Sequence, residues 1–293
     1  MALMNFGLDS EYAELTSILL YKPAPAIAGH PDPQSIQHLA SINYEELSLE
    51  LDELIDTFTS LDVQVTLIDP PEESSDPSNY NMMFCRDLFF MTPKGAILAN
   101  MANETRRGEV SHTARTFAKA GIPVLHTIYG EGRFEGADAL WINNRLVAVG
   151  VGNRTNMQGF EQIKTVLRKQ GVNSVPLPST QKTTQHLLGS MQIVDRDLAL
   201  VREEIISPKT IAFLEKRGFR IVGIPETLEV RSRQAMNIVT VAPRKVIMTA
   251  GCPETKHIYL DAGIEIVAEL TISQLINGSG GLACTTGTLA RMS

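Results

Sequence analysis

Residues 84–101, FCRDLFFMTPKGAILANM, contain the repeating unit on which the chain is built. Two apolar runs flank the turn residues 92–95, which predicts two short strands joined by a tight turn. The following stretch over 104–120 has the periodicity of an amphipathic helix, and residues 123–128 are apolar and extended in character. The segment therefore predicts a ββαβ unit.

The same pattern recurs along the chain at intervals of roughly 50 residues. Further copies pair strands over 137–151, 191–201 and 237–250 with helices over 156–170, 208–217 and 255–262, and with closing strands over 174–177, 220–224 and 265–268. A fifth copy is divided between the chain ends: strand 17–21, helix 44–60 and strand 63–68, completed by residues 281–289. Five units around an axis predict an α/β, five-bladed ββαβ propeller with pseudo-fivefold symmetry, in which no strand edge is left bare. An ordinary α/β sandwich with one open sheet is the alternative.

Length and composition narrow the classes of function. The 293 residues, 43% of them hydrophobic, can bury a sizeable core, and we expect a single catalytic domain spanning residues 1–293. The formal net charge is −7, and no Lys/Arg run stands out, so nucleic acid is not an expected partner. The N-terminal stretch has no signal-peptide pattern and the chain no long apolar run, which predicts a cytoplasmic protein without a membrane partner. A homo-oligomer is possible, and the sequence leaves that open.

The cysteines and histidines suggest reactive side chains rather than metal ligands. The three cysteines, Cys85, Cys252 and Cys284, are odd in number and widely spaced, which fits neither a disulfide framework nor a zinc site with paired cysteines. None of the six histidines forms an H-E-x-x-H pair. The glycine-rich residues 278–281 lack the Lys-Ser/Thr of a phosphate-binding loop. We therefore expect no metal and no cofactor.

Four short segments carry candidate reactive groups, and each also has a plain structural explanation. Cys284 follows glycines, so its thiol could lie in a turn whose N–H groups stabilise a thiolate, or it could be an unremarkable thiol. His186 precedes a predicted strand and could be a structural histidine. Glu135 and Asp138 flank a glycine, as in a capped turn. Asp87 lies in an apolar run, where it needs a partner such as Arg86.

Several motifs occur in an order that resembles the guanidine-modifying enzymes of the pentein superfamily. They are NMMFCRD (81–87), LFFMTPKGAILANM (88–101), ETRRGE (104–109), FEGADAL (134–140), GVGNRTN (150–156), HLLG (186–189), AMN (235–237) and GGLAC (280–284). The superfamily includes arginine deiminase, dimethylarginine dimethylaminohydrolase, amidinotransferases and arginine dihydrolase. The resemblance covers about residues 79–290 and implies a five-bladed ββαβ fold and a small guanidino substrate, such as arginine.

The resemblance assigns roles by position. Cys284 matches the nucleophile, His186 the general acid and base, Glu135 and Asp87 the carboxylates that hold the guanidinium, and Arg106 and Arg154 the arginines that hold the substrate's α-carboxylate. Arg107, beside Arg106, is an alternative carboxylate ligand. Asp138, in the E-G-x-D motif, is expected to orient His186 or its loop, and Asn237 to position backbone. The chemistry suits these residues, because a delocalised guanidinium needs carboxylates that hold its planar fork and a strong, soft nucleophile at its face.

Two departures from the patterns bear on the reaction. Leu188 stands where arginine deiminase has a second aspartate two residues after its histidine. Asn81 stands six residues before Asp87, where dimethylarginine hydrolases carry a guanidinium-binding aspartate. An asparagine at this kind of position resembles the arginine dihydrolases, which take arginine to ornithine, carbon dioxide and two ammonia, and the resemblance implies that reaction through a covalent thiouronium. The chemistry agrees, because an amide both donates and accepts hydrogen bonds and can hold a neutral ureido group. The alternatives are a one-step hydrolase giving citrulline, an amidinotransferase, and a non-catalytic binding protein of the same fold.

Overall fold

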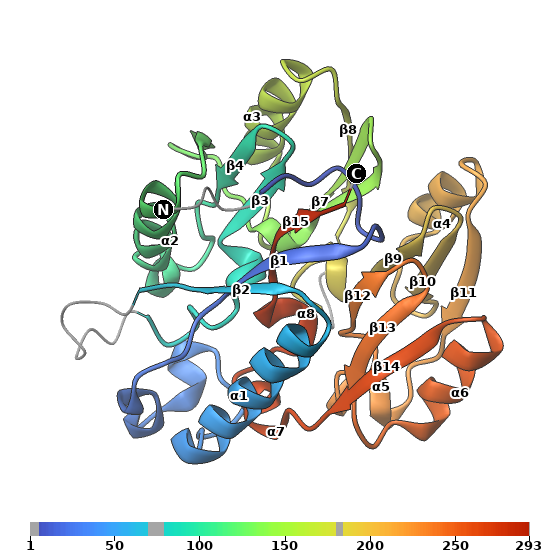
Figure 1. Ribbon diagram of the computed structural model, residues 1–293. Coiled ribbons are helices and arrows are strands. Elements are labelled where there is room, and N and C mark those ends of the chain that lie inside the picture. Colours follow the sequence, from blue (N-terminus) through green and yellow to red (C-terminus); the bar gives the residue numbers. More distant parts are fainter. Residues whose placement is uncertain (1–5, 70–78, 180–183, 293) are drawn as a thin grey trace.

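The computed structural model describes residues 6–69, 79–179 and 184–292. Its strands form five sheets of three, arranged around a centre (Figure 1). In every sheet the middle strand pairs antiparallel with one neighbour and parallel with the other. This is the predicted ββαβ propeller, because a helix crossover is what a parallel pair requires.

Four units are continuous in sequence. Their strands are β3 (Phe89–Thr92), β4 (Gly95–Leu98), β5 (Val124–Thr127), β6 (Ala139–Asn143), β7 (Leu146–Val151), β8 (Asn173–Pro178), β9 (Met191–Asp195), β10 (Leu198–Arg202), β11 (Arg220–Ile224), β12 (Val239–Ala242), β13 (Lys245–Thr249) and β14 (Glu265–Leu270). Their crossover helices are α2 (Glu109–Ala120), α3 (Met157–Arg168), α4 (Pro208–Glu215) and α6 (Pro253–Asp261).

The fifth unit joins the two ends of the chain, as predicted. β1 (Leu15–Leu20) lies between β15 (Gly287–Arg291), with which it is antiparallel, and β2 (Gln64–Leu67), with which it is parallel. α1 (Tyr44–Ser60) connects β1 to β2. The ring is therefore closed by hydrogen bonds between the first and last strands. Residues 282–291 thereby lie beside the unit of β3–β5 and the unit of β6–β8.

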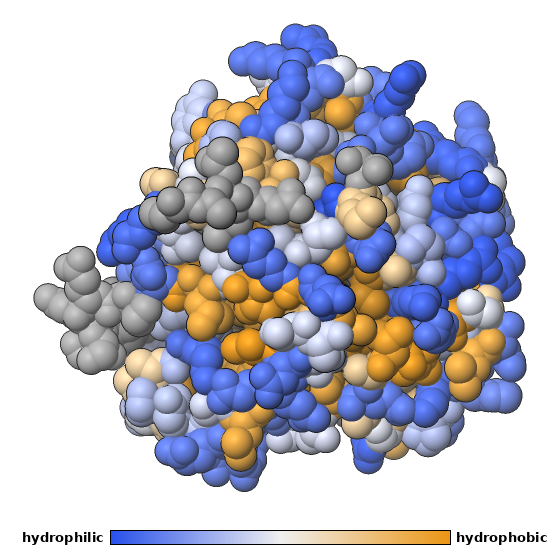
Figure 2. Space-filling model, viewed as in Figure 1, coloured by the Kyte–Doolittle hydropathy of each residue, from blue (hydrophilic) through white to orange (hydrophobic). Residues whose placement is uncertain are grey.

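Helix α1 shows how the outer layer is held. Its buried apolar residues recur at helical spacing and face the sheet that contains β1 and β2. They are Leu47, Leu51, Leu54 and Phe58. Each of these side chains contributes about 1.5–3 kcal/mol by leaving water. The side chain of Asn43 caps the helix by accepting from the N–H groups of Glu45 and Glu46. Figure 2 shows the face of Figure 1 with hydrophilic residues mainly at its periphery and hydrophobic residues gathered nearer the middle.

Some boundaries differ from the sequence prediction. Residues 84–88, predicted as strand, contain the short 3-10 helix η4 (Cys85–Asp87), in which the N–H of Asp87 bonds the carbonyl of Phe84. Residues 282–285 form the one-turn helix α8 (Leu282–Thr285) ahead of β15. The short helices α5 (Leu228–Ser232) and α7 (Ser273–Asn277) were not predicted, because five residues are too few to show periodicity.

Among the described helices, none combines the length and the apolar character needed to cross a bilayer. The cytoplasmic location and the single domain over residues 1–293 stay predictions.

Candidate active site

Residues of five units meet where the chain enters the first strand of each sheet. Asp87 precedes β3, Glu135 precedes β6, His186 precedes β9, Asn237 precedes β12, and Cys284 precedes β15. Three of these positions belong to 3-10 turns: η4, η6 (Gly136–Asp138) and η7 (Leu187–Gly189). Pseudo-symmetry thus explains why residues far apart in sequence converge, since equivalent positions of a closed ring all face its axis.

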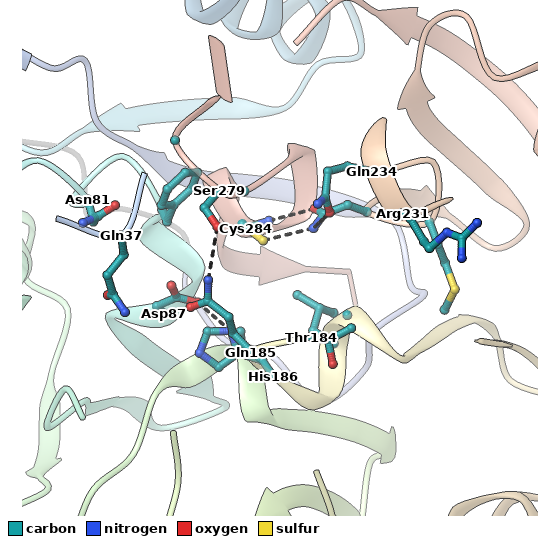
Figure 3. A pocket seen from close by; sticks show the side chains of 18 of the residues that line it. Gln37, Asn81, Asp87, Thr184, Gln185, His186, Arg231, Gln234, Ser279 and Cys284 are labelled. Carbon is teal, nitrogen blue, oxygen red and sulfur yellow. Dashed lines mark hydrogen bonds and ion pairs between the residues drawn. The ribbon is translucent and has the colours of Figure 1, made fainter. Parts of the chain in front are cut away.

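A cavity of about 130 Å³ lies among these segments (Figure 3). Asp87, His186, Asn237 and Cys284 all line it. Glu135 does not, because its side chain is completely buried behind His186. The structure therefore brings the predicted nucleophile, the predicted acid and one predicted carboxylate to a common space, and places the second carboxylate behind it.

Close packing of the first two units sets the position of Glu135. A Cβ atom at Gly136 would collide with the backbone carbonyls of Phe89 and Arg86, so glycine is needed for η6 to approach η4. Glu135 Oε2 then lies 2.6 Å from Nε2 of His186, and Oε1 accepts from the N–H of Ala102 at 3.0 Å. Both oxygens of Glu135 are thus used inside the protein.

His186 is held between two carboxylates. Its Nδ1 lies 3.7 Å from Oδ1 of Asp87, on the side of the ring opposite to Glu135. Burial lowers the pKa of His186, but the charges of Asp87 and Glu135 outweigh it and raise the pKa to about 9. Glu135 is also buried, yet its hydrogen bond and ion pair with His186 hold the pKa of its carboxyl below the ordinary value. At neutral pH the pair is imidazolium and carboxylate, and Nδ1–H is the proton that a bound molecule can take.

Asp87 has one occupied and one free oxygen. Its Oδ2 lies 2.7 Å from Nη1 of Arg106, whereas Oδ1 is buried and accepts no hydrogen bond from the described residues. Arg106 is in turn bonded by Nε to Oε2 of Glu109 at 3.0 Å and by Nη2 to the carbonyl of Asn81 at 3.1 Å. A buried carboxylate with an unpartnered oxygen costs free energy unless a ligand satisfies it. Oδ1 of Asp87 is therefore open to a hydrogen-bond donor on a molecule in the cavity.

Cys284 is positioned by Asn237. The Oδ1 atom of Asn237 accepts from the N–H groups of Ala283 (2.7 Å) and Cys284 (3.2 Å), and its Nδ2 lies 3.0 Å from Sγ of Cys284. Gly281 permits this approach, because a Cβ there would lie 2.8 Å from the Asn237 amide carbon. Burial, followed by the charge of Asp87, raises the pKa of Cys284 to about 11, although the bond from Asn237 opposes this. In the unliganded protein Cys284 is therefore a thiol.

Asp138 lies outside the cavity and supports the segment that carries His186. It is fully buried, and its Oδ1 accepts from the N–H of Leu187 at 2.9 Å while Oδ2 accepts from the hydroxyl of Thr155 at 2.7 Å. Burial raises the pKa of its carboxyl to about 6. Both oxygens are engaged within the protein, so Asp138 is placed to orient the loop of His186 and not to contact a ligand.

The arginines predicted to bind a carboxylate differ in position. Arg106 lines the cavity and is buried, whereas Arg107 is exposed and pairs with Glu104 at 3.3 Å, so Arg106 is the one brought to the site. Arg154 is buried beside the cavity without lining it. Its Nη2 donates to Oε1 of Gln185 at 2.5 Å, and its Nη1 lies 3.6 Å from Oε1 of Glu135.

Side-chain amides outnumber carboxylates in the wall of the cavity. Asp87 is the only carboxylate among the described residues that line the cavity, whereas five side-chain amides line it: Gln37, Asn81, Gln185, Gln234 and Asn237. Asn81 is buried, and its Nδ2 donates to the carbonyl of Ile36 at 2.8 Å. Figure 3 shows Asn81 and Gln37 at one end, with Asp87, His186 and Cys284 further along.

One atom each of Asp87, Glu135 and His186 lies within 4.8 Å of the others, a spacing that could hold a metal ion. The charge arrangement explains the cluster differently, since a protonated imidazole between two carboxylates balances their charge and has no free lone pair for a metal. We propose no metal here, and the expected absence of metal and cofactor stays a prediction.

Two participants, Glu109 and Gln185, and one contact of Asn237 were missed from sequence. Glu109, the counter-ion of Arg106, stands in the quoted ETRRGE motif at helical i,i+3 spacing, which could have pointed to an ion pair. Gln185, next to His186, and the contact of Asn237 with the thiol carry no sequence signal, because both depend on how separate units meet.

Comparison with known proteins agrees with this geometry. The family model described as arginine deiminase matches residues 56–216, more than half of the chain. An uncharacterized protein of Aeropyrum pernix is 26% identical over 247 residues, covering 84% of each chain. The N(G),N(G)-dimethylarginine dimethylaminohydrolase of Streptomyces coelicolor is 21% identical over 253 residues, covering 85% of this chain and 88% of that one.

Among solved structures, the N-terminal domain of ArgZ, an arginine dihydrolase from the ornithine-ammonia cycle in cyanobacteria, has a TM-score of 0.79 at 17% identity, covering 95% of this chain and 98% of that one. At that identity the likeness shows the fold alone, which is the predicted pentein propeller. The match of the family model decides the rest: the chain belongs to the arginine deiminase family of the guanidine-modifying pentein superfamily, and it is a hydrolase acting on carbon–nitrogen bonds of linear amidines.

Proposed function

We propose that the protein hydrolyses the guanidino group of arginine through a covalent intermediate on Cys284. The observation that carries the proposal is the unpartnered Oδ1 of buried Asp87, which lines one cavity together with Cys284 and His186. A guanidinium bonded to Oδ1 would satisfy that oxygen and present its carbon to the thiol. The positive charge that it brings would lower the pKa of Cys284, so the thiol releases its proton to solvent and the thiolate forms when substrate is bound.

The protonation states fit the order of the steps. Cys284 Sγ attacks the guanidinium carbon, and Nδ1–H of His186 protonates the departing nitrogen, leaving a thiouronium on Cys284. His186 is then neutral and accepts a proton from water, which attacks the thiouronium carbon. Glu135 keeps Nε2 bonded and stabilises the imidazolium throughout. The sulfur leaves as thiolate, and the product of this round is citrulline with one ammonia.

We further propose that hydrolysis continues to ornithine, carbon dioxide and a second ammonia. Amide groups donate and accept hydrogen bonds, so a cavity with one carboxylate and five amides suits a neutral ureido group as well as a cation. A cavity lined by two carboxylates would favour the guanidinium alone.

Binding of the amino-acid head group is proposed from the resemblance, with Arg106, which donates to the carbonyl of Asn81, at that end of the cavity and with Arg154 beside Gln185. In the unliganded protein Asp87 holds Arg106, and Gln185 holds Arg154. Binding of the head group would therefore require Gln185 to release Arg154. Arg154→Gln should then raise KM for arginine more than for agmatine, which lacks the carboxylate.

The test of the covalent step is direct. The enzyme is mixed with arginine, quenched in acid within the first turnovers, and digested for mass spectrometry. We expect the peptide that contains Cys284 to carry arginine less ammonia. Turnover without any adduct on this peptide, under conditions where substrate saturates, would contradict the proposal.

A further inference from the structure

The cavity extends past the reactive residues to a second end that arginine hydrolysis leaves unused. Figure 3 shows Arg231 and Gln234 at the end opposite to Asn81 and Gln37, with Cys284 and His186 between the two ends. Val230 and Met236, which are close to Arg231 and Gln234 in sequence, also line the cavity and are buried, so they add apolar surface to it. A substrate whose head group lies at the Asn81 end would direct the nitrogen that leaves towards Arg231.

This second end carries an uncompensated positive charge. Arg231, on α5, lines the cavity and is exposed, and its side chain makes no hydrogen bond or ion pair with any residue that the structure describes. The other arginine there, Arg202, is held by Glu226 through two bonds of 2.5 Å. No carboxylate of the described residues lines this end. An arginine fork beside apolar surface suits a short acidic substituent.

We propose that the enzyme also accepts arginines whose terminal nitrogen carries an acidic alkyl group, and that Arg231 binds this acid. The inference rests on the proposed function, because it uses the same nucleophile, the same acid and the same placement of the head group. It makes Arg231 a specificity-determining residue for the group that leaves.

The reaction balances without a further reactant. Sγ of Cys284 bonds to the guanidinium carbon, the bond from that carbon to the substituted nitrogen breaks, and Nδ1–H of His186 protonates this nitrogen. The amine departs with its carboxylate still charged and takes a further proton from solvent, which the hydrolysis of the thiouronium returns. Water then supplies the oxygen of the ureido product and restores the thiolate and the imidazolium.

Two substrates of matched size isolate the charge. The first is Nω-(carboxymethyl)arginine, which carries a carboxylate. The second is its neutral amide, Nω-(carbamoylmethyl)arginine, which carries an amide at the same position. We expect wild-type kcat/KM to be about five-fold or more higher for the acid, which corresponds to about 1 kcal/mol for a well-formed exposed ion pair. The ratio of the two kcat/KM values should fall to about 1 in Arg231→Gln and stay near the wild-type value in Arg231→Lys. Arg115→Gln, which neutralises an exposed arginine of α2 that does not line the cavity, should keep the wild-type ratio.

The outcomes separate this inference from the proposed function. A wild-type ratio near 1, or a high ratio that survives in Arg231→Gln, would overturn the role of Arg231 while arginine is still hydrolysed. Hydrolysis of the two substituted arginines with no hydrolysis of arginine would overturn the proposed substrate alone. No adduct on Cys284 with any of the three compounds would overturn both.

Discussion

Nε2 of His186 lies 2.6 Å from Oε2 of Glu135, a carboxylate with no exposed surface. The pair explains why a histidine buried inside the ring is charged at neutral pH. A carboxylate at this distance, with Asp87 on the other side, stabilises the imidazolium more than burial destabilises it, and the pKa of His186 rises to about 9.

Replacing Glu135 should therefore move the alkaline limit of activity. In Glu135→Gln the imidazolium loses an anionic partner, its pKa falls, and the proton for the leaving group is lost at lower pH. We expect the alkaline decline of kcat, near pH 9 in the wild type, to shift down by at least about one pH unit, with kcat reduced by about 10²-fold or more. Glu131→Gln, at an exposed position, is the control. An unchanged alkaline limit would show that another group supplies the proton.

The nucleophile can be tested against the two other cysteines. Cys284→Ser should lower kcat by about 10³-fold or more while leaving thermal unfolding nearly unchanged, because a serine hydroxyl in this setting is a far weaker nucleophile than a thiolate. Cys85 and Cys252 are buried in the core, so replacing them with alanine should cost some stability, about 1 kcal/mol, and retain turnover. A Cys284→Ser enzyme with near-normal kcat would exclude the covalent route.

A substitution at Asn237 tests how this residue affects the pKa of the Cys284 thiol. Asn237→Asp keeps the acceptor for the N–H groups of Ala283 and Cys284 but places a negative charge about where Nδ2 lies, 3.0 Å from Sγ. The pKa of Cys284, already raised to about 11, should rise further, and alkylation by iodoacetamide at pH 8 to 10 should slow. Thermal unfolding serves as the control for folding. Faster alkylation than in the wild type would contradict this placement of the amide.

The amide of Asn81 tests the second round of hydrolysis. Asn81→Asp adds a carboxylate to the cavity wall, which favours the cationic guanidinium over a neutral ureido group, so the products should shift from ornithine towards citrulline. The variant also loses the hydrogen bond from Nδ2 to the carbonyl of Ile36, at a cost of about 1 kcal/mol in stability. Asn81→Ala loses the same bond without the charge and is the matched control. Equal product ratios in the two variants and the wild type would leave Asn81 a structural role only.

The repeat was the part of the structure that could be predicted best from the sequence. The strands β10 and β11 and the helix α4 lie within a few residues of their predicted positions, because each unit carries its own apolar pattern and turn residues. Even the division of the fifth unit between the chain ends could be predicted, since β1, α1 and β2 form an incomplete copy of the pattern.

The candidate active site could be predicted only in part from the sequence. The family motifs pointed to Cys284, His186 and Asp87, and the structure brings these side chains to one cavity. The placement of Glu135 behind His186 could not be predicted, because it depends on how closely η6 packs on η4. The free cation of Arg231 was missed for a similar reason, since α5 has no family motif and reaches the cavity only through the arrangement of the fourth unit.

The most direct test of the central claim is the stoichiometry of products from arginine. The purified enzyme is incubated with arginine until substrate is exhausted, and ornithine, citrulline and ammonia are measured together, with a parallel incubation on citrulline alone. The account predicts two ammonia and one ornithine per arginine, and ornithine from citrulline as well. One ammonia and one citrulline per arginine, with citrulline left unchanged, would contradict the second hydrolysis and make the protein a one-step arginine hydrolase.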